Sequence, residues 1–398
     1  DPTASLTKNW QAVNAVGGEN NLSHLNPLPA ATATLSIPLL VSTPLDTVTF
    51  PAPWKTVIFQ HGITTNRTVM LAVADSLAAA GFAVLAIDMP LHGVNSSNPF
   101  YQAGNERTFD VDLVTEGGLV AIPSPDAVTD SSGAHYINLS NLLVTRDNVR
   151  QSVSDLFALT SAVATIDVDK DGTPDLDATN ISFVGHSLGA IVGTTFVALE
   201  PRINDAVFAM GGGGVAKILD GSAAFSPAIV AGLAAASGGA INKAGTPAEK
   251  AAYEAFLGVA QTVVDSADAV NYATQAATGR GVLYFEVVGD GTPGTSDLVV
   301  PNTVPDALAA ISTPVTAPSA LSGTGPVLAL MGLTQVDSSQ TGSDLKLVTK
   351  FTSGDHSSIL SPAADAAVTT EMQTEMASFL GSAGAAVSID PTVLQVVP

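Results

Sequence analysis

The sequence contains no cysteine and few basic residues. Its 398 residues include 14 Lys and Arg against 36 Asp and Glu, which gives a net charge of −22 at pH 7. The absence of cysteine excludes disulfides, thiolate metal ligands and a cysteine nucleophile. The acidic balance argues against nucleic acid as a partner, because phosphate binding requires a basic surface. Any contact with lipid would therefore depend on apolar surface rather than on charge.

Long hydrophobic runs are also missing. No segment reaches the roughly 18 consecutive apolar residues that indicate a membrane-spanning helix. The chain opens with Asp1-Pro2-Thr3-Ala4 and shows no signal peptide, so we expect a mature or trimmed form. An acidic, lysine-poor composition rich in small residues is typical of exported or salt-exposed bacterial proteins. It predicts a secreted or cell-surface location.

The apolar residues that are present occur in short runs. Hydrophobic residues make up 46% of the chain and charged residues 13%, which favours a large packed core. Segments 55–60, 82–87 and 282–288 are apolar and rich in β-branched residues, as buried strands are. A helical pattern at 67–80 joins the first two, and strand–helix–strand units build parallel sheets. We therefore expect an α/β fold with a mostly parallel central sheet flanked by helices.

The most informative motif is Gly185-His186-Ser187-Leu188-Gly189. It lies between an apolar run at 181–184 and a helical run of small residues at 190–196. The pattern G-x-S-x-G between a strand and a helix is the nucleophile elbow of α/β-hydrolases. Its glycines permit the tight turn that presents the serine. The motif predicts Ser187 as a nucleophile; the alternative is an ordinary glycine-rich turn.

A serine nucleophile needs a histidine base and a carboxylate that orients it. In this fold the chain order is serine, acid, histidine. Only one of the six histidines, His356, follows the motif, and it lies in a polar loop after the expected strand 345–351. This elimination predicts His356 as the base, against the alternative of a solvated loop residue.

Two aspartates after the strand 282–288 are candidates for the acid. Asp297 begins the segment Asp-Leu-Val-Val-Pro, in which a polar residue precedes a return to the core. Asp290 lies between two glycines and is typical of a turn. Glu286 is inside the strand, and Asp355 is adjacent to the histidine, so both are weaker candidates. We predict Asp297.

Two backbone amides should stabilise the oxyanion of a tetrahedral intermediate. One is expected from Leu188, directly after the nucleophile. The other is expected from Ile63 in the segment 60–64, where Gly62 lets the backbone approach the substrate. The alternative for this segment is a simple turn after a strand.

An acidic segment at 167–177 precedes the elbow strand. Asp167, Asp169, Asp171 and Asp175, with Gly172, follow the first nine positions of a calcium-binding loop. The glutamate that such loops carry at their last position is replaced by Ala178, and Asp177 or a more distant acid is the candidate to take its role. The segment predicts a structural Ca²⁺ held by five candidate ligands, against the alternative of an acidic surface turn. These ligands are Asp167, Asp169, Asp171, Thr173 and Asp175. No cofactor is required for the serine chemistry itself.

We expect residues 1–34 to be a polar lead-in and 35–398 to form one catalytic domain. Strands are also expected at 34–42 and 206–210, and helices at 147–166 and 372–380. Two insertions are expected in the domain, at about 94–145 and 211–280. The second is alanine-rich and helical, which is typical of a lid or cap. Its stretch 223–236 either lines an acyl-chain groove or packs as an ordinary helix; the side chains concerned are Phe225, Ile229, Val230 and Leu233.

The segments 61–67, 86–93, 137–156, 167–177 and 183–193 together resemble the bacterial extracellular lipases that include surface-exposed lysophospholipases. This resemblance implies an α/β-hydrolase fold and hydrolysis of carboxylic esters in acyl lipids. It also implies the catalytic positions Ser187, Asp297 and His356.

These observations favour an esterase or lipase that forms an acyl-enzyme at Ser187. A phospholipase A or lysophospholipase with the same residues is the closest alternative. A peptidase or amidase, and a hydrolase-fold protein that only binds, are further alternatives. The expected partners are an acyl ester or lipid, with transient contact between the lid and a lipid interface.

Overall fold

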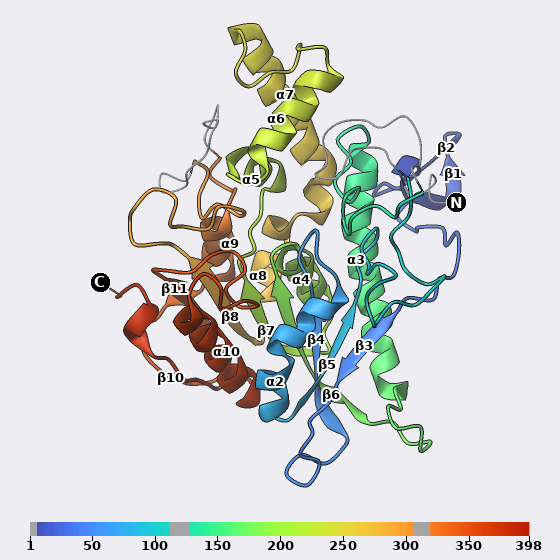
Figure 1. Ribbon diagram of the computed structural model, residues 1–398. Coiled ribbons are helices and arrows are strands. Elements are labelled where there is room, and N and C mark those ends of the chain that lie inside the picture. The colour runs from blue at the N-terminus through green and yellow to red at the C-terminus, as the bar shows by residue number, and fades with distance from the viewer. Residues whose placement is uncertain (1–5, 112–126, 306–318, 398) are drawn as a thin grey trace.

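The central element of the chain is an eight-stranded sheet. The computed structural model describes residues 6–111, 127–305 and 319–397. The strand order is β3-β5-β4-β6-β7-β8-β11-β9, and every neighbouring pair is parallel except β3 with β5 (Figure 1). The strands are β3 (Leu39–Ser42), β4 (Trp54–Gln60), β5 (Phe82–Ile87), β6 (Leu176–His186), β7 (Ile203–Ala209), β8 (Gly281–Val287), β9 (Thr334–Gln335) and β11 (Lys346–Phe351).

The sheet is buried on both faces, which explains the continuous apolar runs in its strands. Every residue of β5 and β8 is buried. Ile58 of β4 pairs with Leu85 on one side and Phe183 on the other, in the middle of the sheet. Its own side chain joins one hydrophobic core, whereas its neighbours Val57 and Phe59 join the other. Because successive side chains of a strand point to opposite faces of the sheet, each strand contributes to both hydrophobic cores.

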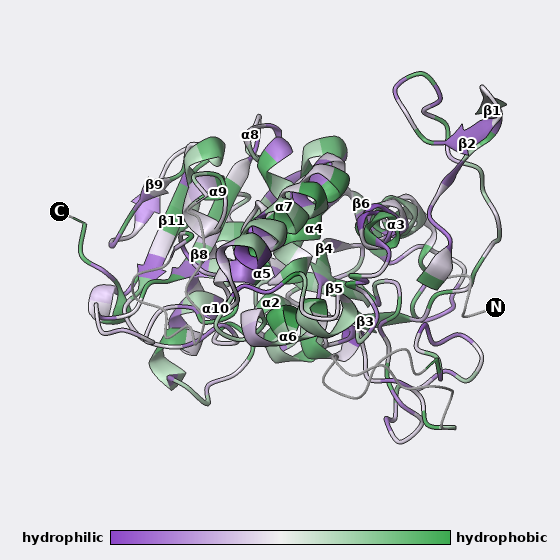
Figure 2. Cartoon of the chain, turned by 90° about the horizontal axis from the view of Figure 1, so that it is seen from above, coloured by the Kyte–Doolittle hydropathy of each residue, from purple (hydrophilic) through white to green (hydrophobic). Residues whose placement is uncertain are grey.

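Helices cover both faces of the sheet (Figures 1 and 2). One face carries α2 (Leu71–Ala79) and α10 (Ala366–Gly381). The other face carries α3 (Leu142–Ala162), α4 (Leu188–Leu199), α8 (Ala273–Ala276) and α9 (Thr324–Met331). The fold is therefore the helix–sheet–helix sandwich that the strand pattern predicts. Short 3-10 helices occur at Arg67–Met70, Val163–Thr165, Asp265–Ala267, Ala269–Asn271 and Pro391–Val393.

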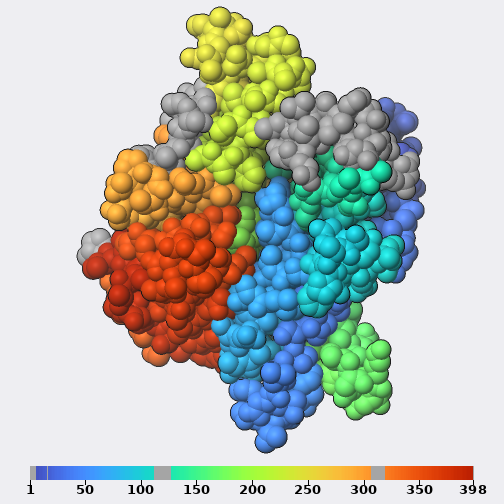
Figure 3. Space-filling model, viewed as in Figure 1, coloured from blue at the N-terminus to red at the C-terminus, as the bar shows by residue number. Residues whose placement is uncertain are grey.

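A group of three helices projects beyond the carboxyl ends of the strands, and we call it the cap. It consists of α5 (Val215–Gly221), α6 (Ser226–Ala236) and α7 (Pro247–Val264), and it stands out from the body in Figures 1 and 3. Among the described residues, no single helix is both long and apolar enough to cross a membrane. The pair α5 and α6 meets that requirement only jointly and is bent by 102°.

A buried polar cluster holds the cap helices together. Lys243 Nζ lies 2.7 Å from Asp220 Oδ1, and both side chains are fully buried. The Tyr253 hydroxyl donates to the same oxygen at 3.0 Å. Because an unpaired charge at this depth would be costly, the lysine, the aspartate and the tyrosine fix α5 and α7 relative to each other.

Several element boundaries differ from the expected ones. The expected lead-in 1–34 contains an antiparallel hairpin of β1 (Gln11–Val16) and β2 (Glu19–Asn21). The strand expected at 34–42 begins only at Leu39. The helix expected at 147–166 begins at Leu142, because the Asn141 side chain caps it by accepting from the Val144 amide. Part of the insertion expected at 94–145 lies outside the described residues.

The carboxy-terminal helix α10 starts earlier than the expected range 372–380. The Asp365 side chain caps its first turn by accepting from the Ala367 amide at 2.9 Å. After α10, the strand β12 (Ala386–Val387) pairs antiparallel with β10 (Gln340–Thr341). These two strands form a separate small sheet, and with two residues each they are too short for a sequence pattern to show them.

Glu375 of α10 is buried without a cation partner among the described residues, and this makes stability depend on pH. Burial raises the pKa of this carboxyl well above its ordinary value, and the nearby Glu371 adds to the effect. A raised folded-state pKa means that stability falls as pH rises above the ordinary glutamate range. Glu375→Gln should therefore raise the melting temperature by roughly 2–4 °C near pH 8.

The same substitution should change the melting temperature little near pH 5, where the glutamate is already protonated in the folded protein. Scanning calorimetry at the two pH values measures the difference. The matched control is Glu254→Gln, which removes a half-exposed carboxylate that pairs with Lys217 at 2.8 Å. An equal gain from Glu375→Gln at both pH values would contradict the prediction.

Candidate active site

Four loops meet at the carboxyl edge of the sheet. Ile63 follows β4, Ser187 follows β6, Asp297 follows β8 and His356 follows β11. Because these strands are parallel, their carboxyl ends lie along one edge, where α/β folds form their ligand sites. The sheet thus brings together residues that are far apart in sequence, since Ile63 and His356 are separated by 293 positions.

Ser187 occupies a strained turn between β6 and α4. Its φ of 57° and ψ of −123° lie in a region that non-glycine residues seldom adopt. Its amide donates to the Ala209 carbonyl at 2.9 Å, which anchors the turn to β7. A Cβ atom at Gly189 would lie 2.1 Å from the Gln60 oxygen, and one at Gly185 would lie 2.6 Å from the Gly189 oxygen. Only glycine fits at these two positions of the motif.

The three residues proposed for catalysis form one hydrogen-bonded chain. His356 Nε2 lies 2.7 Å from Ser187 Oγ, and His356 Nδ1 lies 2.7 Å from Asp297 Oδ2. Asp297 and Ser187 are almost fully buried, at 2% and 4% exposure. With a proton on Nδ1, the imidazole donates to the carboxylate and accepts from the serine hydroxyl. This is the arrangement in which histidine can act as a base towards serine.

Backbone amides fix the Asp297 carboxylate. Its Oδ1 accepts from the amides of Val299 at 2.8 Å and Val300 at 3.0 Å. The apolar segment after the aspartate therefore has a specific role, because its amides leave only Oδ2 free to face the histidine. The sequence pattern that favoured Asp297 contains these two valines.

The other candidate acids are engaged elsewhere. Asp290 is exposed, and its Oδ1 accepts from the Thr292 amide at 2.9 Å; this hydrogen bond lowers its pKa. Glu286 lies 3.0 Å from Lys350 Nζ. Asp355 accepts from the Ser357 amide within its own turn. Of the four candidates, the structure brings only Asp297 to His356.

The backbone after β4 lies directly against the nucleophile. A Cβ atom at Gly62 would lie 2.9 Å from Ser187 Cβ and 3.3 Å from its Oγ. Ile63 and Leu188 line the same cavity as Ser187. The Leu188 amide belongs to the first turn of α4, where amides have no partner within the helix. The Ile63 amide donates to no acceptor in the described parts of the chain. Both amides are therefore available to an oxyanion.

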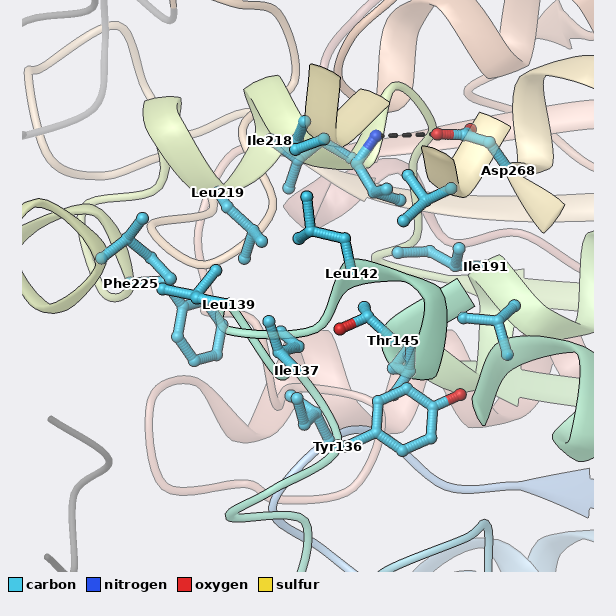
Figure 4. Close-up of a pocket in the computed structure, with 18 of the residues that line it drawn as sticks. Tyr136, Ile137, Leu139, Leu142, Thr145, Ile191, Ile218, Leu219, Phe225 and Asp268 are labelled. Carbon is cyan, nitrogen blue, oxygen red and sulfur yellow. Dashed lines mark hydrogen bonds between the residues drawn. The ribbon is translucent and has the colours of Figure 1, made fainter. Parts of the chain in front are cut away.

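An apolar cavity of about 120 Å³ opens beside Ser187. Figure 4 shows its wall from Tyr136 to Leu142 facing Ile218, Leu219 and Phe225 of the cap. Asp268 also borders it, but its carboxylate accepts from the amides of Gly214 and Val215. The cavity therefore offers mainly hydrophobic contact. Its lining also includes Ile63, Val149, Ile191, Ile229, Phe256, Leu257, Val299 and Val300.

The cap stretch 223–236 divides between the two roles expected for it. Phe225 and Ile229 line the cavity. Leu233 does not line the cavity; it packs with Ile229, Tyr253 and Leu257 in the hydrophobic cluster of the cap, with Val230 at its edge. The opposite wall of the cavity, 136–149, was not predicted from the sequence. It belongs partly to the insertion expected at 94–145 and partly to α3, and neither was predicted to line a cavity.

His186 is a further residue at the site that the sequence did not indicate. Its Nε2 lies 2.7 Å from the His356 carbonyl oxygen, so it donates to the backbone of the loop that carries the base. Complete burial lowers the pKa of His186 to about 3, which keeps it neutral. It occupies a variable position of the elbow motif, so the motif carries no signal for this contact.

The acidic segment before β6 is only partly assembled as expected. Carboxylate oxygens of Asp167, Asp169 and Asp175 lie within 4.8 Å of one another. Among the described residues, Asp171 is not in this group of carboxylates; its Oδ1 accepts from the Thr173 amide at 2.7 Å, and Thr173 as a ligand stays a prediction. Three carboxylates are suitable ligands for calcium, and calcium binding stays a prediction.

If calcium binds this segment, millimolar Ca²⁺ should raise the melting temperature by roughly 2–4 °C, because a ligand of the folded state stabilises it. The variant Asp167→Asn/Asp169→Asn should lose that increase. Asp177→Asn is a matched control, since Asp177 lies outside the group and accepts from Thr179. An equal calcium response in the control and in the double variant would contradict the prediction.

Comparison with known proteins adds distant structural matches. No family model matches the chain, and no curated protein matches it. Among solved structures, it is similar to a 2,6-dihydroxy-pseudo-oxynicotine hydrolase, with 14% identity over 96% of this chain and 69% of that one, at a TM-score of 0.43. It is also similar to a monoacylglycerol lipase of Paleococcus ferrophilus, with 13% identity over 88% of this chain and 100% of that one, at a TM-score of 0.42.

A third similar structure is acetyl xylan esterase 1 of a Thermoanaerobacterium species, with 16% identity over 87% of this chain and 79% of that one, at a TM-score of 0.40. Likeness at this level concerns the fold alone. The sheet order, the antiparallel first strand and the serine turn after β6 are those of the α/β-hydrolase fold. The chain has this fold, as the sequence predicted.

Proposed function

We propose that the protein is a serine hydrolase of carboxylic esters whose acyl part is apolar. The observation that carries this proposal is the chain from Asp297 through His356 to Ser187, with 2.7 Å at both links, beside an apolar cavity. A buried serine that is hydrogen-bonded to a histidine has a proton acceptor in place. A serine hydroxyl without such an acceptor is a poor nucleophile at neutral pH.

In the proposed reaction, Ser187 Oγ attacks the ester carbonyl while His356 Nε2 takes its proton. The amides of Ile63 and Leu188 donate to the oxyanion that forms. His356 then gives the proton to the leaving alcohol, and Asp297 stabilises the imidazolium in between. A water molecule, deprotonated by His356, then attacks the acyl carbonyl; the bond to Ser187 Oγ breaks, His356 returns the proton to Oγ, and the acid leaves. The cavity under the cap receives the acyl group.

The lining of the cavity bears on the class of substrate. Its walls provide hydrophobic contact, which suits an aliphatic acyl chain. They provide few hydrogen-bond partners for a charged or polyhydroxylated acyl group. This supports an esterase or lipase over an amidase for peptides with polar side chains. A phospholipase A or lysophospholipase would use the same residues and differ in how the alcohol part is bound.

A panel of p-nitrophenyl esters from acetyl to palmitoyl tests the proposal together with an alkyl fluorophosphonate probe. We expect one probe molecule per chain, attached at Ser187, and hydrolysis that is fastest for a butyryl or longer ester. A folded protein that reacts with neither the probe nor any ester would overturn the proposal and favour a protein that only binds.

A further inference from the structure

The carbonyl oxygen of Gly62 accepts hydrogen bonds from three groups of its own loop. His61 Nδ1 lies 2.8 Å from it, and the Thr65 hydroxyl donates to it at 2.8 Å. The Thr65 amide also donates to it, at 3.4 Å. A backbone carbonyl with three donors has a fixed direction, and this one belongs to the peptide that joins Gly62 to Ile63.

That peptide has two ends, which point in opposite directions. In a planar trans peptide the carbonyl of Gly62 and the amide of Ile63 are antiparallel. The carbonyl end is held by the loop, whereas the amide has no acceptor in the described chain, and Ile63 borders the cavity beside Ser187. Fixing the carbonyl therefore fixes the direction in which the Ile63 amide can donate.

We propose that Thr65 is a positioning residue for the oxyanion-binding amide of Ile63, acting through its hydroxyl on the Gly62 carbonyl. The inference rests on the proposed function, because it assigns this amide to an oxyanion. Thr65 does not line the cavity, and its hydroxyl donates to the Gly62 carbonyl, so its effect on the site passes through the Gly62–Ile63 peptide.

The surroundings of Thr65 show why this peptide needs to be held. Thr64 has a φ of 65°, an unfavourable value for a β-branched residue, so the loop would relax if it were released. The Thr65 carbonyl accepts from the Ser132 hydroxyl at 2.5 Å. His61 is fixed independently, since its Nε2 accepts from the Met89 amide at 3.1 Å. Of the two side chains that donate to the Gly62 carbonyl, His61 is buried and Thr65 is half-buried. Thr65 can therefore be replaced without disturbing a buried histidine.

The test compares Thr65→Val, which keeps the side-chain shape, with Thr65→Ser, which keeps the hydroxyl. Loss of an entire oxyanion donor lowers kcat by about 10²–10³-fold, so misdirecting one donor should lower kcat by about 10-fold. We expect this loss for Thr65→Val with KM nearly unchanged, because a ground-state ester does not yet carry the oxyanion. Thr65→Ser should restore kcat to within about three-fold of the wild type.

A trifluoromethyl ketone separates positioning from a merely structural role. It forms a tetrahedral adduct with serine whose oxyanion needs the same amides. Its inhibition constant for Thr65→Val should rise by the same factor as kcat/KM falls, while fluorophosphonate still labels Ser187 completely. Thr68→Val is the matched control, since it removes a hydroxyl of the same segment that donates to Asn66 rather than to Gly62.

Three results would overturn the positioning role. The first is no loss of kcat/KM in Thr65→Val, and the second is a loss of kcat/KM without a parallel loss of ketone affinity. The third is unfolding of Thr65→Val and of a second variant without the hydroxyl, Thr65→Ala, judged by melting temperature, which would assign the hydroxyl to stability. Failure of the proposed function itself is distinguishable, because wild-type protein would then show neither labelling nor hydrolysis.

Discussion

Replacing Ser187 with alanine should lower kcat for p-nitrophenyl ester hydrolysis by about 10⁵-fold or more. The serine Oγ is the atom that His356 Nε2 contacts at 2.7 Å, and alanine leaves the histidine with no nucleophile to activate. The fold should survive, because the strained backbone of residue 187 is held by the hydrogen bond that its amide donates to the Ala209 carbonyl and by the two flanking glycines. Initial rates with butyryl and decanoyl esters, together with melting temperature, measure both effects.

Ser357→Ala is the matched control for this substitution. Ser357 is exposed and directly follows the histidine. Its removal should leave kcat within about two-fold of the wild type, as surface substitutions usually do. If Ser187→Ala kept substantial activity while folded, hydrolysis would have to come from another group, and the assignment of the nucleophile would be wrong.

Asp297→Asn should lower kcat by about 10⁴-fold without unfolding the protein. The amides of Val299 and Val300 donate to Oδ1, so asparagine would place its oxygen there and turn its NH₂ group towards the imidazole. An NH₂ group donates to Nδ1, which forces the proton of the neutral imidazole onto Nε2. The histidine could then no longer accept the proton of Ser187.

Asp290→Asn distinguishes the two aspartates that the sequence left as candidates. Asp290 is exposed and, within the described parts of the chain, forms hydrogen bonds only inside its own turn, so its substitution should change kcat less than about three-fold. Parallel kinetics of both variants measure this contrast. A large loss with Asp290→Asn and a small loss with Asp297→Asn would reverse the assignment of the acid.

Much of the central sheet was predictable from sequence. The runs expected at 55–60, 82–87, 282–288 and 345–351 match β4, β5, β8 and β11 within one residue at each end. Parallel strands buried on both faces must be apolar along their whole length, so composition alone reveals them. The amino-terminal hairpin was not predicted, because β1 and β2 are largely exposed and carry no apolar pattern.

Helix boundaries were less predictable, because side-chain caps set them. With Asn141 as its cap, α3 begins at Leu142, five residues before the expected start at 147. With Asp365 as its cap, α10 begins at Ala366, six residues before the expected start at 372. Such caps depend on one hydrogen bond between a side chain and a backbone amide. The periodicity of apolar residues does not register them.

The sequence by itself determined the sheet, the serine turn and the candidate base. Each of these depends on neighbours along the chain or on elimination: the glycines around Ser187 act within five residues, and only one histidine follows them. Local sterics and hydrophobic burial act over short distances in sequence, so a linear pattern carries them.

Only the tertiary structure decided which aspartate faces His356, which walls line the cavity and what the Thr65 hydroxyl contacts. The acid and the base are 59 residues apart, and the base and the serine 169. The wall of the cavity combines α3 with cap helices that begin more than 50 residues after α3 ends. Such contacts require an accuracy of a fraction of an ångström. That accuracy comes from the register of parallel strands and the packing of helices on them, which no linear spacing encodes.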